Sequence, residues 1–139
     1  MLEGKLKDSY NEIFKLALKN NIKFSFNPNF SNKLWITDEE IKSFKKHFEK
    51  FIENANLIKL SKDELLLLTE IEDETKAVQS IINKNAKALI CITRGCDDTI
   101  FAWKNEINYV STILAKNLVD TTGARDAFIS NLINDYVTL

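Results

Sequence analysis

The chain has 139 residues, of which 45% are hydrophobic and 28% are charged, so it fits one globular domain with a sizeable core. Its formal net charge is -1, and its Lys and Arg residues are scattered among Asp and Glu. No basic stripe is therefore available for nucleic acid or for an acidic membrane surface. Because no apolar signal core and no run of about 18 apolar residues occurs, we expect a cytoplasmic protein with no membrane partner.

Hydrophobic spacing predicts helices and strands that alternate along the chain. Apolar residues on one helical face mark the first helix, and the alternation of Ile22, Phe24 and Phe26 marks the first strand. A capping signal, Thr37 with Glu40, precedes the second helix. In chain order the pattern predicts a helix through 10–18, a strand at 22–26, a helix at 37–52, a strand at 57–60, a Leu-rich helix from 61, a helix around 78–82 and a strand at 88–93.

Two further patterns complete the chain. Residues 99–103 and 107–111, separated by three turn residues, predict a β-hairpin, and residues 126–136 predict a final helix. Strands that alternate with helices imply a parallel sheet. The expected fold class is therefore α/β, with parallel β-strands flanked by helices, and a β-hairpin.

The two cysteines lack the spacing of a zinc site or a clear disulfide. Cys91 falls inside an apolar strand pattern, and Cys96 falls in the turn that follows it. We therefore expect one packed thiol and one loop thiol.

The most informative segment for chemistry is residues 118–128. It combines an apolar strand end, a turn of small residues and a helix that begins with a carboxylate. Unpaired N–H groups in a first helical turn bind phosphate oxygens, and Asp126 is placed to act as a base toward a hydroxyl group. The alternative is an ordinary capped helix start, because Thr and Asp are favoured there for backbone hydrogen bonding alone.

This segment closely resembles the Asp-Thr-Thr-Gly-Ala-Gly-Asp-Ala-Phe signature of the ribokinase/fructokinase-type (PfkB) carbohydrate kinase family, with Arg125 where the family has glycine. Other segments resemble family landmarks in the same order. They are residues 27–31 before Leu34 and Trp35, the strand at 56–60 with Glu64 after it, and residues 89–95. The chain is thus identified as a member of this family that matches its carboxy-terminal part.

The resemblance implies a partial ribokinase-like, three-layer fold over residues 1–139, without the family's amino-terminal sugar-binding and lid region or its final nucleotide-closing helices. It implies ATP and Mg2+ as cofactors and a sugar, fructose or a related one, as substrate. By similarity, Asp126 is the catalytic base and Glu64 organises Mg2+. The resemblance places the following residues toward ATP: Lys59, Glu64, Thr93, Gly95, Thr122, Gly123, Ala124 and Arg125.

Several residues depart from the family pattern. Arg125 adds a long cation beside the phosphate path, where it either obstructs the anion cradle or pairs with phosphate oxygens. Asn27, Ser31 and Asn131 also differ from the residues that are usual in the family. Glu64 has a structural explanation as well, because with Ser61 it forms a capping box that needs no metal.

Two interpretations of function therefore stay open. In the first, the chain belongs to an ATP-dependent, Mg2+-requiring sugar kinase that resembles fructokinase and is either truncated or completed by a separately encoded chain. In the second, it is a catalytically inactive kinase fragment that acts as a remnant, a phosphate or nucleotide binder, or an interaction module. The expected protein partners are a complementing chain or further copies of the same chain.

Overall fold

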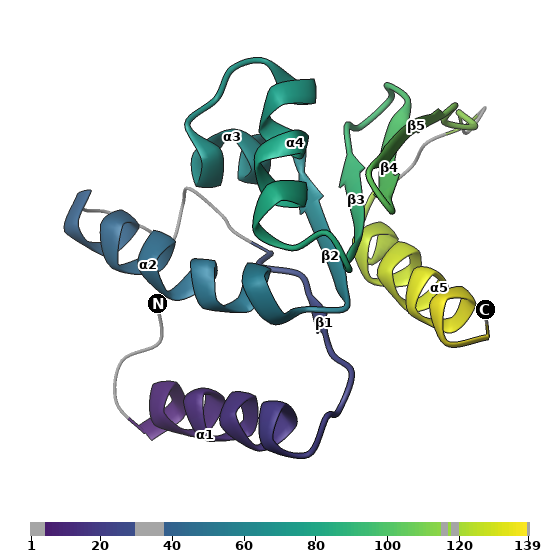
Figure 1. The fold of residues 1–139 in the computed structure, drawn as a ribbon. Helices are drawn as coiled ribbons and strands as arrows, with labels where there is room; N and C mark the ends of the chain where they lie inside the picture. The colour runs from purple at the N-terminus through teal and green to yellow at the C-terminus, as the bar shows by residue number, and fades with distance from the viewer. Residues whose placement is uncertain (1–4, 30–37, 115–116, 118–119, 139) are drawn as a thin grey trace.

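The computed structural model describes residues 5–29, 38–114, 117 and 120–138 (Figure 1). They form a five-stranded mixed sheet in the order β1-β2-β3-β4-β5 with helices on both faces. The elements in chain order are α1 (Lys5–Lys19), β1 (Ser25–Phe26), α2 (Asp38–Asn54), β2 (Leu57–Ser61), α3 (Lys62–Thr69), α4 (Glu74–Lys84), β3 (Leu89–Thr93), β4 (Thr99–Trp103), β5 (Glu106–Val110) and α5 (Ala124–Thr138).

The strand pairing confirms the expected α/β class. β1, β2 and β3 are parallel, whereas β4 and β5 form an antiparallel hairpin on the far side of β3. β2 and β3 are paired along their whole length, and their register sets Lys59 beside Cys91 and Ser61 beside Thr93. Cys91 is buried and Cys96 is exposed, so the predictions for both thiols are confirmed.

The predicted first strand is shorter than expected. Ile22 stays in the turn after α1, where its N–H donates to the carbonyl of Ala17 over 2.9 Å. Phe24 bonds to the side chain of Asn56, with its N–H donating to Oδ1 over 3.1 Å, so the regular ladder begins only at Ser25. The predicted cap Thr37 lies outside the described residues.

Alternation along the strands gives the sheet two different faces. One face carries the main apolar core, in which Ile58, Leu60 and Ile92 pack against α2, α3 and α4. The opposite face carries Lys59 and Cys91 and is covered by α5 (Figure 1). No residue of α5 is buried, so this face is covered less completely than the core face. Within the described ranges, none of the helices has the length and apolar character that a bilayer span requires.

Asn85 fixes the carboxyl end of α2 against α4. Its Nδ2 donates to the carbonyl of Ile52 over 2.7 Å and to that of Ala55 over 2.8 Å, and its Oδ1 accepts from the N–H of Lys87 over 3.2 Å. The side chain is only 8% exposed. One buried amide therefore satisfies carbonyls that a helix end leaves without intrahelical partners.

This junction predicts a stability defect. Asn85→Ala leaves the carbonyls of Ile52 and Ala55 without this donor, so we expect the free energy of unfolding to fall by about 2–4 kcal/mol. Urea unfolding followed by circular dichroism measures the change. The matched control is Asn83→Ala, an exposed position in the last turn of α4, which should stay within about 0.5 kcal/mol of the parent. Equal losses in the two variants would contradict the assigned role of Asn85.

Candidate functional site

The candidate site lies where the parallel strands end. The carboxyl ends of β1, β2 and β3 share one edge of the sheet, and ligands of open α/β sheets bind in the crevice outside such an edge. The segment after β1 reaches the start of α5 there, because Arg125 Nη1 donates to Asn29 Oδ1 over 3.4 Å. Two predicted motifs that are 96 positions apart in the chain are thus brought together.

The turn before α5 is built by its own side chains. Asp120 Oδ1 accepts from the N–H of Thr122 over 3.0 Å and from its hydroxyl over 2.9 Å. These bonds, led by the Thr122 hydroxyl, lower the pKa of Asp120. The N–H of Ala124 donates to the carbonyl of Thr121 over 3.1 Å, which closes the turn around Gly123 at φ 77°. A turn of this kind favours glycine, because other residues are strained at positive φ.

Asp120 is a residue to which the sequence analysis gave no role. Its side chain sets the path of the turn by accepting from the residue two positions later, which is the pattern of an Asx-turn. The spacing of Asp120 and Thr122 is the signal that could have identified it. Leu118 and Val119, which open the predicted motif, lie outside the described residues, as do Ser31, Leu34 and Trp35.

The amino end of α5 presents backbone donors to a hollow of about 230 Å³. The N–H of Ala124 is engaged in the turn, but no described residue accepts from the N–H groups of Gly123, Arg125 and Asp126. Such groups carry the positive end of the helix dipole. The residues that line the hollow are Asn29, Thr121, Gly123, Ala124, Arg125 and Asp126. The arrangement suits an anion about the size of a phosphate group.

Lys59 adds a second cation beneath this region. It is only 2% exposed. Burial lowers the pKa of Lys59 below its ordinary value; the Glu64 carboxylate opposes this shift, and the Arg125 guanidinium adds to it. On the neighbouring strand, burial raises the pKa of the Cys91 thiol to about 12. Lys59 is therefore a desolvated cation with an inert thiol beside it.

Glu64 closes the predicted capping box. Its Oε2 accepts from the N–H of Ser61 over 2.6 Å, and its own N–H donates to Ser61 Oγ over 3.2 Å. Within the described part of the chain, no three His, Cys, Asp or Glu side chains are close enough to hold a metal ion. A Mg2+ ion with Glu64 as a ligand would thus need oxygens from phosphate or water, as Mg2+ sites commonly use.

Thr93 is the last residue of β3 and Gly95 lies in the turn that follows it; neither residue lines the hollow. Thr93 Oγ1 donates to the carbonyl of Leu60 over 3.4 Å. Gly95 has φ 66° and open space where a side chain would stand, so the backbone is accessible at this turn. The predicted roles of Thr93 and Gly95 toward a nucleotide stay predictions.

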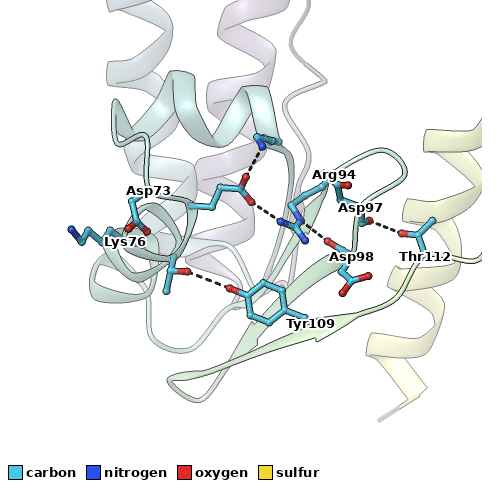
Figure 2. Close-up of polar contacts among 10 residues, drawn as sticks. Asp73, Lys76, Arg94, Asp97, Asp98, Tyr109 and Thr112 are labelled. Carbon is cyan, nitrogen blue, oxygen red and sulfur yellow. Dashed lines mark hydrogen bonds and ion pairs between the residues drawn. The ribbon is translucent and has the colours of Figure 1, made fainter.

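An ion-pair network holds this turn to the helices beside it (Figure 2). Glu74, at the start of α4, contacts Lys62 Nζ at 2.6 Å and Arg94 Nη1 at 3.0 Å. Arg94 also donates through Nε to the carbonyl of Asp98, which closes the turn. The pKa of Glu74 is lowered mainly by its hydrogen bond to Lys62. The starts of α3 and α4 are thereby connected to the turn that carries Gly95.

Comparison with solved structures defines the class as a ribokinase-like α/β fold. Adenosine kinase from Sinorhizobium meliloti superposes with a TM-score of 0.78 at 17% identity, covering 98% of this chain and 39% of that one. Fructokinase with bound ATP from Xylella fastidiosa superposes with a TM-score of 0.68 at 24% identity, covering 85% of this chain and 36% of that one. At these identities the likeness establishes the fold alone.

The sequence profile of the pfkB family carbohydrate kinases matches residues 1–138, so the chain belongs to this family. A fructokinase from Vibrio alginolyticus is 29% identical over 109 residues, which are 78% of this chain and 34% of that protein. A probable fructokinase-2 from Arabidopsis thaliana is 34% identical over 116 residues, covering 81% of this chain and 33% of that protein. The chain therefore spans about a third of the length of these relatives.

The buried lysine predicts a dependence of stability on pH. Because its pKa is lowered on folding, the unfolded chain binds more protons between that lowered value and 10.5, and stability rises with pH through this window. Lys59→Met removes the desolvated charge. We expect the variant to be more stable than the parent at neutral pH, on the order of 1 kcal/mol, with an advantage that shrinks as the pH approaches 10.5.

Urea unfolding at neutral and alkaline pH tests this expectation. The matched control is Lys50→Met on the exposed surface of α2, for which no pH-dependent advantage is expected. An advantage of Lys59→Met that does not change with pH would contradict the lowered pKa.

Proposed function

We propose that this chain supplies the phosphoryl-binding part of a fructokinase-like sugar kinase, which transfers a phosphoryl group from ATP to a sugar hydroxyl. The observation that carries the proposal is the hollow at the start of α5, with its backbone donors and the Arg125 contact to Asn29. The family of the chain and its fructokinase relatives support the choice of reaction.

Each described residue has a physical reason for its proposed part in the reaction. The N–H groups of Gly123 and Arg125 and the Arg125 guanidinium hold negative charge on the transferring group, which ATP supplies when it is bound. Asp126, exposed in the first turn of α5, takes the proton of the sugar hydroxyl. Lys59 contributes a desolvated positive charge below the site. Glu64 would help to hold a Mg2+ ion, which would supply positive charge to stabilise the transferring phosphoryl group.

A non-catalytic role is the second candidate. It is supported by Arg125, because this side chain stands at the edge of the hollow, where the family has glycine, and is held by Asn29. In this role the chain binds phosphate or nucleotide, or acts as an interaction module, without turnover. The two candidates share the anion site and differ in the function of Asp126.

Phosphate binding should depend on Arg125. We expect Arg125→Gly to weaken the binding of inorganic phosphate and of Mg2+-ATP by about tenfold, and to reduce its salt dependence, because a charge-assisted hydrogen bond is lost. Calorimetric titration at low and high salt measures both effects. Lys87→Gly is the matched control, since it makes the same charge change in an exposed turn after α4. Tighter binding by Arg125→Gly would mean that the arginine obstructs the site, and unchanged binding would move the site elsewhere.

Turnover should depend on Asp126 only in a completed kinase. By itself the chain should show no fructose-dependent ATP hydrolysis above background, because it offers too few contacts to position both reactants. With the unmatched part of the Vibrio alginolyticus fructokinase as a complement, Asp126→Asn should lower kcat by about 10^2-fold or more. Asp135→Asn, an exposed position on the same helix, should leave kcat unchanged. A coupled assay that finds equal rates for both variants would remove Asp126 from the proposed role.

A further inference from the structure

The turn between β3 and β4 is spanned by the side chain of Arg94. Its Nε donates to the carbonyl of Asp98 across the turn, and its Nη1 contacts the Glu74 carboxylate at 3.0 Å. The other oxygen of Glu74 contacts Lys62 at 2.6 Å. Only 18% of the Arg94 side chain is exposed. The path of the turn therefore depends on a guanidinium that is itself oriented by a carboxylate at the start of α4.

Tyr109 of β5 holds the same arginine from another side (Figure 2). Its ring centroid lies 5.7 Å from Arg94 Cζ, and its hydroxyl lies 3.2 Å from Oγ1 of Thr75, the residue after Glu74. A planar guanidinium that is paired and stacked in this way has one preferred orientation. The first turn of α4 thus reaches Arg94 both directly and through Tyr109.

Gly95 leaves the backbone of this turn accessible. It has φ 66°, and no described atom lies within 4 Å of the position that a Cβ would occupy. The turn follows β3, whereas Asn29, which lines the hollow at the start of α5, follows β1 at the same edge of the sheet. Two strand spacings separate these segments, which is roughly 10 Å. A single phosphate group is too short to reach both places, but a nucleoside triphosphate is long enough.

We propose that Glu74 is a positioning residue for ATP, which orients Arg94 and thereby fixes the backbone of the turn at Gly95 against which the nucleotide binds. The identity of the ligand rests on the proposed function. Neither Glu74 nor Arg94 touches the nucleotide in this proposal. The guanidinium is already engaged with Asp98, Glu74 and Tyr109, so its effect on the ligand passes through the turn.

The charge of Glu74 separates this role from a direct electrostatic one. The hydrogen bond from Lys62 lowers the pKa of Glu74, so the carboxylate is ionised at neutral pH. A negative charge near the path of an anion repels it, and by electrostatics alone its removal would strengthen ATP binding. Loss of positioning weakens ATP binding instead. The two explanations therefore predict opposite signs for Glu74→Gln.

The test is calorimetric titration of the chain with Mg2+-ATP and, separately, with inorganic phosphate. We expect Glu74→Gln to weaken ATP binding by about tenfold, because the turn is misplaced. Phosphate, which needs only the hollow at α5, should bind the variant and the parent equally well. The matched control is Glu49→Gln, which removes an exposed ion pair with Lys84 and should change neither affinity. Circular dichroism verifies that the variants are folded.

Arg94→Lys tests the geometry rather than the charge. Lysine stays positive but cannot donate to Asp98 and Glu74 from one rigid fork, so this variant should also weaken ATP binding by about tenfold. Because both residues act through the same contact, the double variant should lose no more affinity than either single variant. Hydrogen exchange of the amides at 95–98 should be faster in each variant, since the turn is less ordered.

Unchanged or tighter ATP binding by Glu74→Gln would overturn the proposal. So would equal losses of ATP and phosphate binding, which would indicate a general structural defect, or an Arg94→Lys variant that binds ATP as the parent does. A parent chain that does not bind ATP would overturn it as well. ATP binding that depends on Glu74, without phosphoryl transfer to fructose, would contradict only the proposed kinase activity.

Discussion

The parallel pairing of β2 with β3 is the constraint on which the other features depend. Its register holds five residues of each strand side by side, and alternation then sends Ile58 and Leu60 into the core and Lys59 toward the opposite face. The same register brings the ends of both strands to one edge, where the start of α5 meets the segment after β1. A one-residue slip would exchange the two faces and place Lys59 in the apolar core.

The two faces of the sheet are stabilised very differently. The face toward α2, α3 and α4 carries the apolar core, and Asn85 fixes the end of α2 to it. The other face carries a desolvated lysine under a helix with no buried residue. Regions with few buried apolar contacts open most easily, so α5 should be the part of the fold with the lowest local stability. The candidate anion site therefore lies on the less stable half of the molecule.

Local patterns in the sequence predicted the order and type of the elements, the hairpin and the Ser61–Glu64 capping box, because each depends on neighbouring residues. The first strand was predicted too long, since its start is decided by a distant side chain, Asn56. The contact of Arg125 with Asn29 and the network around Glu74 could not be predicted either. They join residues that only the folded sheet brings together.

The Glu64 carboxylate has two roles that compete with each other: it closes the capping box, and in the proposed function it would bind a metal ion. Oε2 of Glu64 accepts a hydrogen bond from the N–H of Ser61 and so stabilises the first turn of α3. A metal ion that bound this oxygen would have to break that hydrogen bond. Loss of a capping hydrogen bond costs about 1 kcal/mol, so the free energy of metal binding would be less favourable by this amount. Metal binding and the order of the first turn of α3 would then be thermodynamically linked. The affinity for the metal would depend on the stability of that turn.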